Sequence, residues 1–143
     1  MVLIFNLKKI EIMKKTTGFE IKLSPEKSEE YFYNALCNGL SYMSGYGLRL
    51  DFSEIEYKIS SNKLTSPCLE DVFMQMLRDG YKLTLIDEEC EGEYTRSIGL
   101  KEVHDRVQKT DASFLINMAD ENDDADTADA ILQTVFFEEI IFG

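Results

Sequence analysis

The sequence contains few of the residues from which metal and catalytic sites are commonly built. Its 143 residues include one histidine, His104, and three cysteines, Cys37, Cys68 and Cys90. One histidine without closely spaced cysteines argues against a zinc site, and a sparse, odd set of cysteines is typical of reduced thiols inside a cell. No catalytic motif or phosphate-binding loop is recognisable, so we assign no catalytic, cofactor-binding or metal-ligating residue.

Long hydrophobic runs are missing as well. The apolar run Val2–Phe5 is too short to span a membrane, and lysines follow it, whereas an export signal would place them before it. The chain also has no internal repeat and no low-complexity linker, so we expect one domain, in the cytoplasm and without membrane contact. Met13-Lys14-Lys15 resembles a translation start, which predicts that residues 1–12 are an extension and residues 13–143 the domain.

The clearest secondary-structure pattern in the sequence lies between Ser66 and Leu100. Ser66-Pro67 is typical of a helix N-cap followed by its first residue, and Gly80 of a helix end. Between them, apolar residues recur at the helical period, which predicts a buried stripe of Leu69, Val72, Phe73, Met76 and Leu77. Alternation then predicts strands over Tyr81–Asp87 and Tyr94–Ile98, joined antiparallel by an acidic turn.

The same patterns place further elements along the chain. Residues 18–23 alternate as a strand, and Ser24-Pro25 begins a long helix whose Gly39 allows another backbone to pack closely. Leu48 and Leu50 suggest a short strand, and Asp51 or Ser53 caps a third helix. Later helices begin near Leu100 and at the Asp111 cap, and the last buries the stripe Ala128, Ile131, Leu132, Val135 and Phe136.

These elements predict a single α+β domain in which helices pack on one face of a small, mostly antiparallel sheet. We expect that sheet to contain Gly18–Leu23, Tyr81–Asp87 and Tyr94–Ile98. The third helix should turn Phe52, Ile55 and Ile59 to one face, away from its charged residues.

Basic residues are scarce in the second half of the chain. The net charge is −12, and residues 64–143 hold nineteen acidic and six basic residues, while residues 1–63 are nearly neutral. A field of that sign repels nucleic acid and anionic membranes, so direct nucleic-acid binding is not expected. It favours a basic protein partner or cations, or it serves solubility alone.

Two acidic segments are candidates for an interaction surface. One is the predicted hairpin turn and the other precedes the last helix, and together they supply Asp87, Glu88, Glu89, Glu91, Glu93, Asp120, Glu121, Asp123, Asp124 and Asp126. Such an array could imitate the phosphates of a nucleic acid in front of a basic nucleic-acid-binding protein. The second segment begins like a calcium loop, but Ala125 and Ile131 stand where that loop needs glycine and glutamate.

An enzyme is the third hypothesis, after a non-enzymatic interaction or assembly protein and an acidic nucleic-acid mimic. It would require His104 to meet a cysteine inside a pocket, because the neighbouring Asp105 faces elsewhere on a helix. The apolar end of the chain, Ile140, Ile141 and Phe142, either docks on the domain or is a contact surface for a partner, which could be a second copy.

Two segments carry a resemblance to a known family, SPCLEDVFMQMLRDGYKLTLIDEECEGEYT and DDADTADAILQTVFFEEIIFG. The chain resembles a family of small uncharacterised proteins from Bacteroides-type gut bacteria and their phages, including crAss-like phages. The resemblance covers residues 13–143 and implies no activity and no residue role. It implies an intracellular setting, in phage or host, and favours a virion, assembly or host-interaction role over metabolism. It also favours Met13 as the start.

Overall fold

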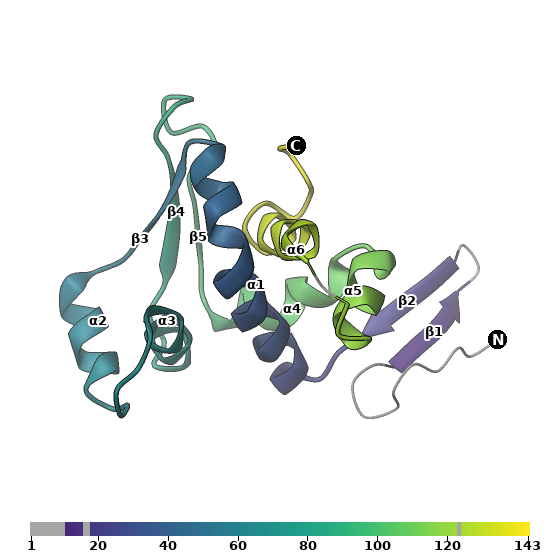
Figure 1. The fold of residues 1–143 in the computed structure, drawn as a ribbon, viewed down its shortest axis with the longest axis horizontal. Coiled ribbons are helices and arrows are strands. Elements are labelled where there is room, and N and C mark those ends of the chain that lie inside the picture. The colour runs from purple at the N-terminus through teal and green to yellow at the C-terminus, as the bar shows by residue number, and fades with distance from the viewer. Residues whose placement is uncertain (1–10, 16–17, 123) are drawn as a thin grey trace.

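Two long helices, α1 (Pro25–Gly45) and α6 (Ala125–Phe137), form the centre of the protein (Figure 1). The computed structural model describes residues 11–15, 18–122 and 124–143. The helices pack closely because α1 offers a glycine at the contact: a methyl group added at Gly39 would lie 3.0 Å from the Cβ of Ala128. The close approach predicted for Gly39 is thus confirmed, and the predicted stripe on α6 is fully buried.

The main sheet has three antiparallel strands in the order β3 (Leu48–Asp51), β4 (Leu83–Asp87) and β5 (Arg96–Ile98). The predicted hairpin is confirmed in β4 and β5, although both strands start later than expected. The prediction that residues 18–23 form the third strand of this sheet is wrong. β2 (Gly18–Lys22) pairs with β1 (Glu11–Lys15) in a separate two-stranded sheet, and the suggested strand at Leu48 takes its place beside β4.

The remaining helices are α2 (Glu54–Ser61), α3 (Leu69–Arg78), α4 (Leu100–Arg106) with the short η1 (Val107–Lys109), and α5 (Ala112–Ala119). The predicted caps Ser24, Ser53 and Asp111 each accept a backbone N–H of the first turn. The predicted N-cap of α3 is wrong. Cys68 occupies that position, and its backbone N–H donates to the Asp71 carboxylate. Ser66 has a left-handed backbone and not the extended backbone that is typical of an N-cap residue.

Two predicted apolar stripes are partly wrong as well. Val72, Phe73, Met76 and Leu77 of α3 are buried, but Leu69 at its first position is exposed. On α2, Ile55 is 74% exposed and Ile59 is also exposed. α2 packs against α3 through half-buried Tyr57, whose ring contacts Phe73, so the outer face of α2 remains uncovered.

The end of the chain docks on the domain. Oε1 of the buried Gln133 accepts the backbone N–H groups of Ile141 and Phe142, at 2.8 and 2.9 Å, and its Nε2 donates to the carbonyl of Phe142. The Phe142 ring stacks on Tyr46 with 5.0 Å between ring centroids. Ile141 and Phe142 are therefore half-buried, while Ile140 is 51% exposed.

The prediction of an α+β domain with helices packed on a small antiparallel sheet is confirmed. Glu11 and Ile12, assigned from the sequence to an extension, lie in β1 and pair with Lys22 and Ile21, while residues 1–10 lie outside the described residues. Among the described residues, no helix is both long and apolar enough to cross a membrane.

Candidate interaction surface

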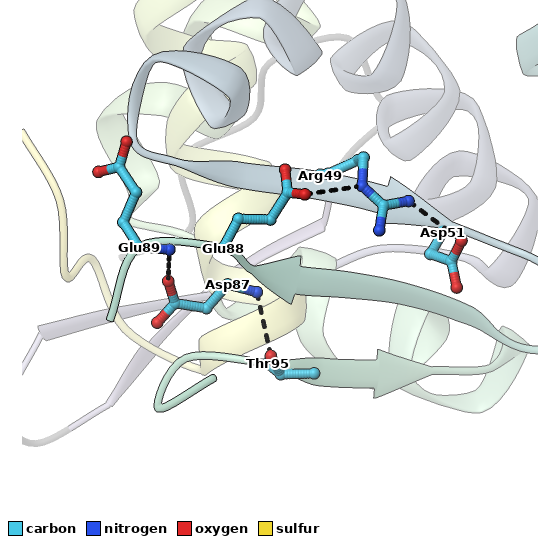
Figure 2. A network of polar contacts seen from close by, with 6 residues as sticks. All are labelled: Arg49, Asp51, Asp87, Glu88, Glu89 and Thr95. Carbon is cyan, nitrogen blue, oxygen red and sulfur yellow. Dashed lines mark hydrogen bonds and ion pairs between the residues drawn. The ribbon is translucent and has the colours of Figure 1, made fainter. Parts of the chain in front are cut away.

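The acidic turn between β4 and β5 is organised by Asp87 (Figure 2). Its carboxylate accepts the backbone N–H groups of Glu89, Cys90 and Tyr94 at 2.8–3.1 Å, and its own N–H donates to Thr95 Oγ1. These bonds, the one from Cys90 foremost, hold the pKa of Asp87 below its usual value despite burial. Asp87 is only 5% exposed, so it shapes the turn and does not belong to the exposed surface.

Glu88, Glu89, Glu91 and Glu93 are all exposed on that turn. Glu88 bonds to Arg49 of β3, whose guanidinium also contacts Asp51, both at 3.2 Å (Figure 2). Glu89 lies against Gly47, where an added Cβ would be 2.5 Å from its carboxyl carbon. Gly47 directly follows α1, so the turn is fixed beside the C-terminal end of that helix.

The acids at the start of α6 reach the same end of α1. Asp124 caps α6 by accepting the backbone N–H of Thr127. Tyr42 donates its hydroxyl to Asp126 at 3.1 Å. Tyr46, the C-cap residue that follows α1, donates to Asp129 at 3.0 Å.

The tyrosine pKa values report the same contacts. Burial and the hydrogen bond to the Asp129 carboxylate raise the pKa of Tyr46 to about 12. The hydrogen bond to Asp126 raises the pKa of Tyr42. Both phenols therefore remain neutral hydrogen-bond donors at neutral pH.

The two acidic segments thus meet around the end of α1. We call this region the acidic end and define it by Glu88, Glu89, Glu91, Glu93, Asp124, Asp126 and Asp129 with Tyr42 and Tyr46. Figure 1 shows the β4–β5 turn, the last turn of α1 and the C-terminus at the same end of the molecule. Tyr42 is 37% exposed, which places an aromatic ring among the carboxylates.

A pocket of about 400 Å³ opens at the acidic end, between the last turns of α1 and the start of β3. The side chains of Leu40, Met43, Leu48 and Leu50 form its apolar part. Glu88, Glu89 and Arg49 also line it, and because Arg49 already binds Glu88, the Glu89 carboxylate is the acid left to meet a ligand.

The remaining predicted surface residues are Asp120, Glu121 and Asp123 on the segment before α6, and Asp124 and Asp126 at its start. Asp120 and Glu121 are exposed between α5 and α6, and Asp123 lies outside the described residues. Asp124 and Asp126 already bind a backbone N–H and a tyrosine hydroxyl. Among the described residues, no cluster of three or more histidine, cysteine, aspartate or glutamate side chains is arranged to hold a metal ion.

His104 does not meet a cysteine. Its Nε2 lies 2.8 Å from Glu29 on α1, and Arg78 of α3 donates to the other oxygen of that carboxylate. Burial alone would raise the pKa of Glu29, but the bonds from His104 and Arg78 lower it overall. The best-formed pockets among the described residues, of about 320–400 Å³, are not lined by His104 or by a cysteine.

Sequence reasoning missed Tyr42, Tyr46 and Arg49. Tyr42 lies on α1 and Tyr46 caps that helix four residues later, while Asp126 and Asp129 are three residues apart on α6, so the spacing could have placed each pair on one face. It could not have shown that the two faces meet. The chain matches no protein-family model, no curated protein and no solved structure.

Proposed function

We propose that this protein is a non-enzymatic interaction protein that binds a basic protein through the acidic end. The observation that carries the proposal is the pair of tyrosine–carboxylate bonds, Tyr42 to Asp126 and Tyr46 to Asp129, which join two acidic segments far apart in the sequence. A solubilising charge does not require carboxylates to be fixed by neighbouring hydroxyl groups. A surface that recognises a partner does, because fixed groups lose less entropy on binding.

The chemistry of the region supports a basic partner. An exposed tyrosine within a ring of charges resembles the aromatic anchors of protein interfaces. The pocket beside Glu89 combines apolar walls with a carboxylate, which suits the aliphatic stem and charged head of a lysine or arginine. The negative field would steer such a partner and make its binding sensitive to salt.

The test compares two triple variants with equal charge. One neutralises the acidic end by Glu91→Gln, Glu93→Gln and Asp126→Asn. The control removes three exposed acids elsewhere by Glu26→Gln, Glu54→Gln and Asp105→Asn. Each tagged protein captures partners from nuclease-treated lysate of Bacteroides cells with and without phage, the setting that the family resemblance suggests, and is eluted in steps of rising salt.

We expect a basic protein that the wild type and the control retain at low salt and that the acidic-end variant loses. Equal loss from both variants would attribute the binding to net charge and would refute the assigned surface. Release of the captured partner by added double-stranded DNA would identify the protein as a nucleic-acid mimic. Retention in the presence of that DNA would identify an assembly or host-interaction role.

A further inference from the structure

Two of the three cysteines lie at one seam between α1 and α3. Cys37 is on α1, and its Sγ lies 3.8 Å from Oε1 of Glu70 in the first turn of α3. Cys68 is the N-cap of α3, and its Sγ lies 3.5 Å from the hydroxyl of Tyr33, one turn before Cys37 on α1. The Cys37 thiol therefore contacts a side chain of α3, which begins directly after Cys68. The Cys68 thiol contacts a side chain of α1, the helix that carries Cys37.

The two thiols are accessible and near each other. Both cysteines are exposed. Cys37 lies against Glu70, two residues after Cys68, and Cys68 lies against Tyr33, four residues before Cys37, so both sulfur atoms face the same part of the seam. Burial and the Glu70 carboxylate raise the pKa of the Cys37 thiol. Nothing in the acidic end uses this pair, so its function is a separate question.

We propose that oxidation by a peroxide joins Cys37 and Cys68 in a disulfide that ties α1 to the first turn of α3. The Cys68 thiolate attacks a peroxide oxygen and becomes a sulfenic acid, releasing hydroxide in the case of hydrogen peroxide. The Cys37 thiolate then attacks the Cys68 sulfur, the S–S bond forms and a second hydroxide leaves. With the two thiol protons the balance is two thiols and one hydrogen peroxide giving one disulfide and two waters.

The geometry assigns this order because the Glu70 carboxylate lies 3.8 Å from the Cys37 sulfur, where its negative charge opposes a thiolate. A thiol that ionises less readily is the poorer first nucleophile for peroxide, so Cys37 serves as the resolving cysteine. The Tyr33 hydroxyl gives up its contact with Cys68 in the oxidised form.

The disulfide would close a loop that contains β3 and α2. Cross-linking a loop of this size restricts the unfolded chain and stabilises the folded one. We expect the melting temperature to rise by roughly 5–10 °C on oxidation. The protein would thereby hold its α1–α3 seam more firmly under oxidative stress than in the reducing state.

Cys90 supplies a matched control within the same chain. It is also exposed, but it lies on the β4–β5 turn at the acidic end. Burial and the charge of Asp87 raise the pKa of its thiol, as burial and Glu70 do for Cys37. A reaction that depends only on exposure would therefore involve Cys90 as often as the other two.

The experiment treats the full chain with hydrogen peroxide at low protein concentration and maps the products by mass spectrometry of unreduced peptides. Wild type and Cys90→Ser should each lose two hydrogen atoms, yield the linked Cys37–Cys68 peptide and gain thermal stability that dithiothreitol reverses. Cys37→Ser and Cys68→Ser should show neither change, while their reduced melting temperatures confirm that they fold. Links through Cys90, dimers between chains, or sulfinic acids without a link would overturn the proposal.

Discussion

Gly39 of α1 lies directly against Ala128 of α6, and a Cβ at Gly39 would be 3.0 Å from the Ala128 Cβ and 3.1 Å from its carbonyl carbon. Backbone at that distance cannot move aside without shifting α6. Gly39→Ala should therefore lose more through overpacking, about 1–3 kcal/mol, than the roughly 1 kcal/mol that alanine gains in helix propensity. We expect urea unfolding to show a net loss of stability of up to about 2 kcal/mol.

Gly45 is the matched control for this substitution. It is the last residue of the same helix, and an added Cβ would have no neighbour within 4 Å. Gly45→Ala should leave the free energy of unfolding unchanged or raise it by a few tenths of a kcal/mol. Equal effects at the two positions would contradict the close packing of α1 on α6.

Gln133 holds the last residues of the chain on the domain. It is fully buried, and its amide satisfies the two backbone N–H groups and one carbonyl described for Ile141 and Phe142. Gln133→Met keeps the volume but leaves those three backbone groups without partners, which should cost roughly 2–4 kcal/mol. Hydrogen exchange at Ile141 and Phe142 should become much faster.

Glu139→Gln tests whether any change near the terminus has this effect. Glu139 is exposed, so its amide variant should keep the wild-type exchange rates at Ile141 and Phe142. Slow exchange in Gln133→Met would show that the aromatic contacts of Phe142 secure the terminus without the Gln133 amide.

Local sequence patterns predicted the helices and the hairpin well. The stripe on α6 and the cap Ser24 on α1 follow from spacing and from capping chemistry, which depend on neighbouring residues only. The prediction of where α3 begins was wrong because two capping signals lie close together in the sequence. Ser66-Pro67 is a favourable start, but the bond from the Cys68 N–H to Asp71 caps the helix two residues later.

The candidate site could be predicted only in part. Its acidic residues were evident from composition. The sequence did not distinguish Asp87 from the exposed acids beside it, although Asp87 is buried and accepts three backbone N–H groups. The contribution of Tyr42 and Tyr46 depends on the packing of α1 against α6, which no local pattern encodes. For the same reason the alternation of residues 18–23 predicted a strand but not its partner.

Asp87 should contribute stability that depends on pH. Its pKa is lowered in the folded protein, so the contribution is present above the unfolded value of about 3.9 and is lost as the pH falls through the lower folded value. Asp87→Asn places an amide NH₂ where a carboxylate oxygen accepts a backbone N–H. Its melting temperature at neutral pH should fall by roughly 3–8 °C.

The gap between Asp87→Asn and wild type should narrow below about pH 4, because wild type then loses what the variant already lacks. Glu91→Gln, on the same turn but exposed, should follow the wild-type melting curve throughout. If the difference in melting temperature stays constant down to about pH 2, ionisation of Asp87 does not contribute to the pH dependence of stability.

Tyr46 should show the opposite dependence at high pH. Its pKa is raised to about 12, so an unfolded chain ionises this phenol above about pH 10, whereas the folded chain ionises it only near pH 12. Stability from the hydroxyl is therefore complete below about pH 10 and is lost as the pH rises through the folded value. Tyr46→Phe keeps the ring that stacks on Phe142 and removes only the bond to Asp129.

Urea unfolding at neutral pH should find Tyr46→Phe less stable by about 1 kcal/mol, and the difference should shrink or reverse between about pH 10 and pH 12. Absorbance titration of the folded protein should show a step near pH 12 in wild type that is smaller by one tyrosine in the variant. Tyr81→Phe, on a half-buried tyrosine outside the acidic end, should leave that high-pH step in place. If the step keeps its full size in Tyr46→Phe, the Asp129 carboxylate does not bind this hydroxyl, and the hydrogen bond from Tyr42 to Asp126 is the tyrosine–carboxylate bond that remains between α1 and the start of α6.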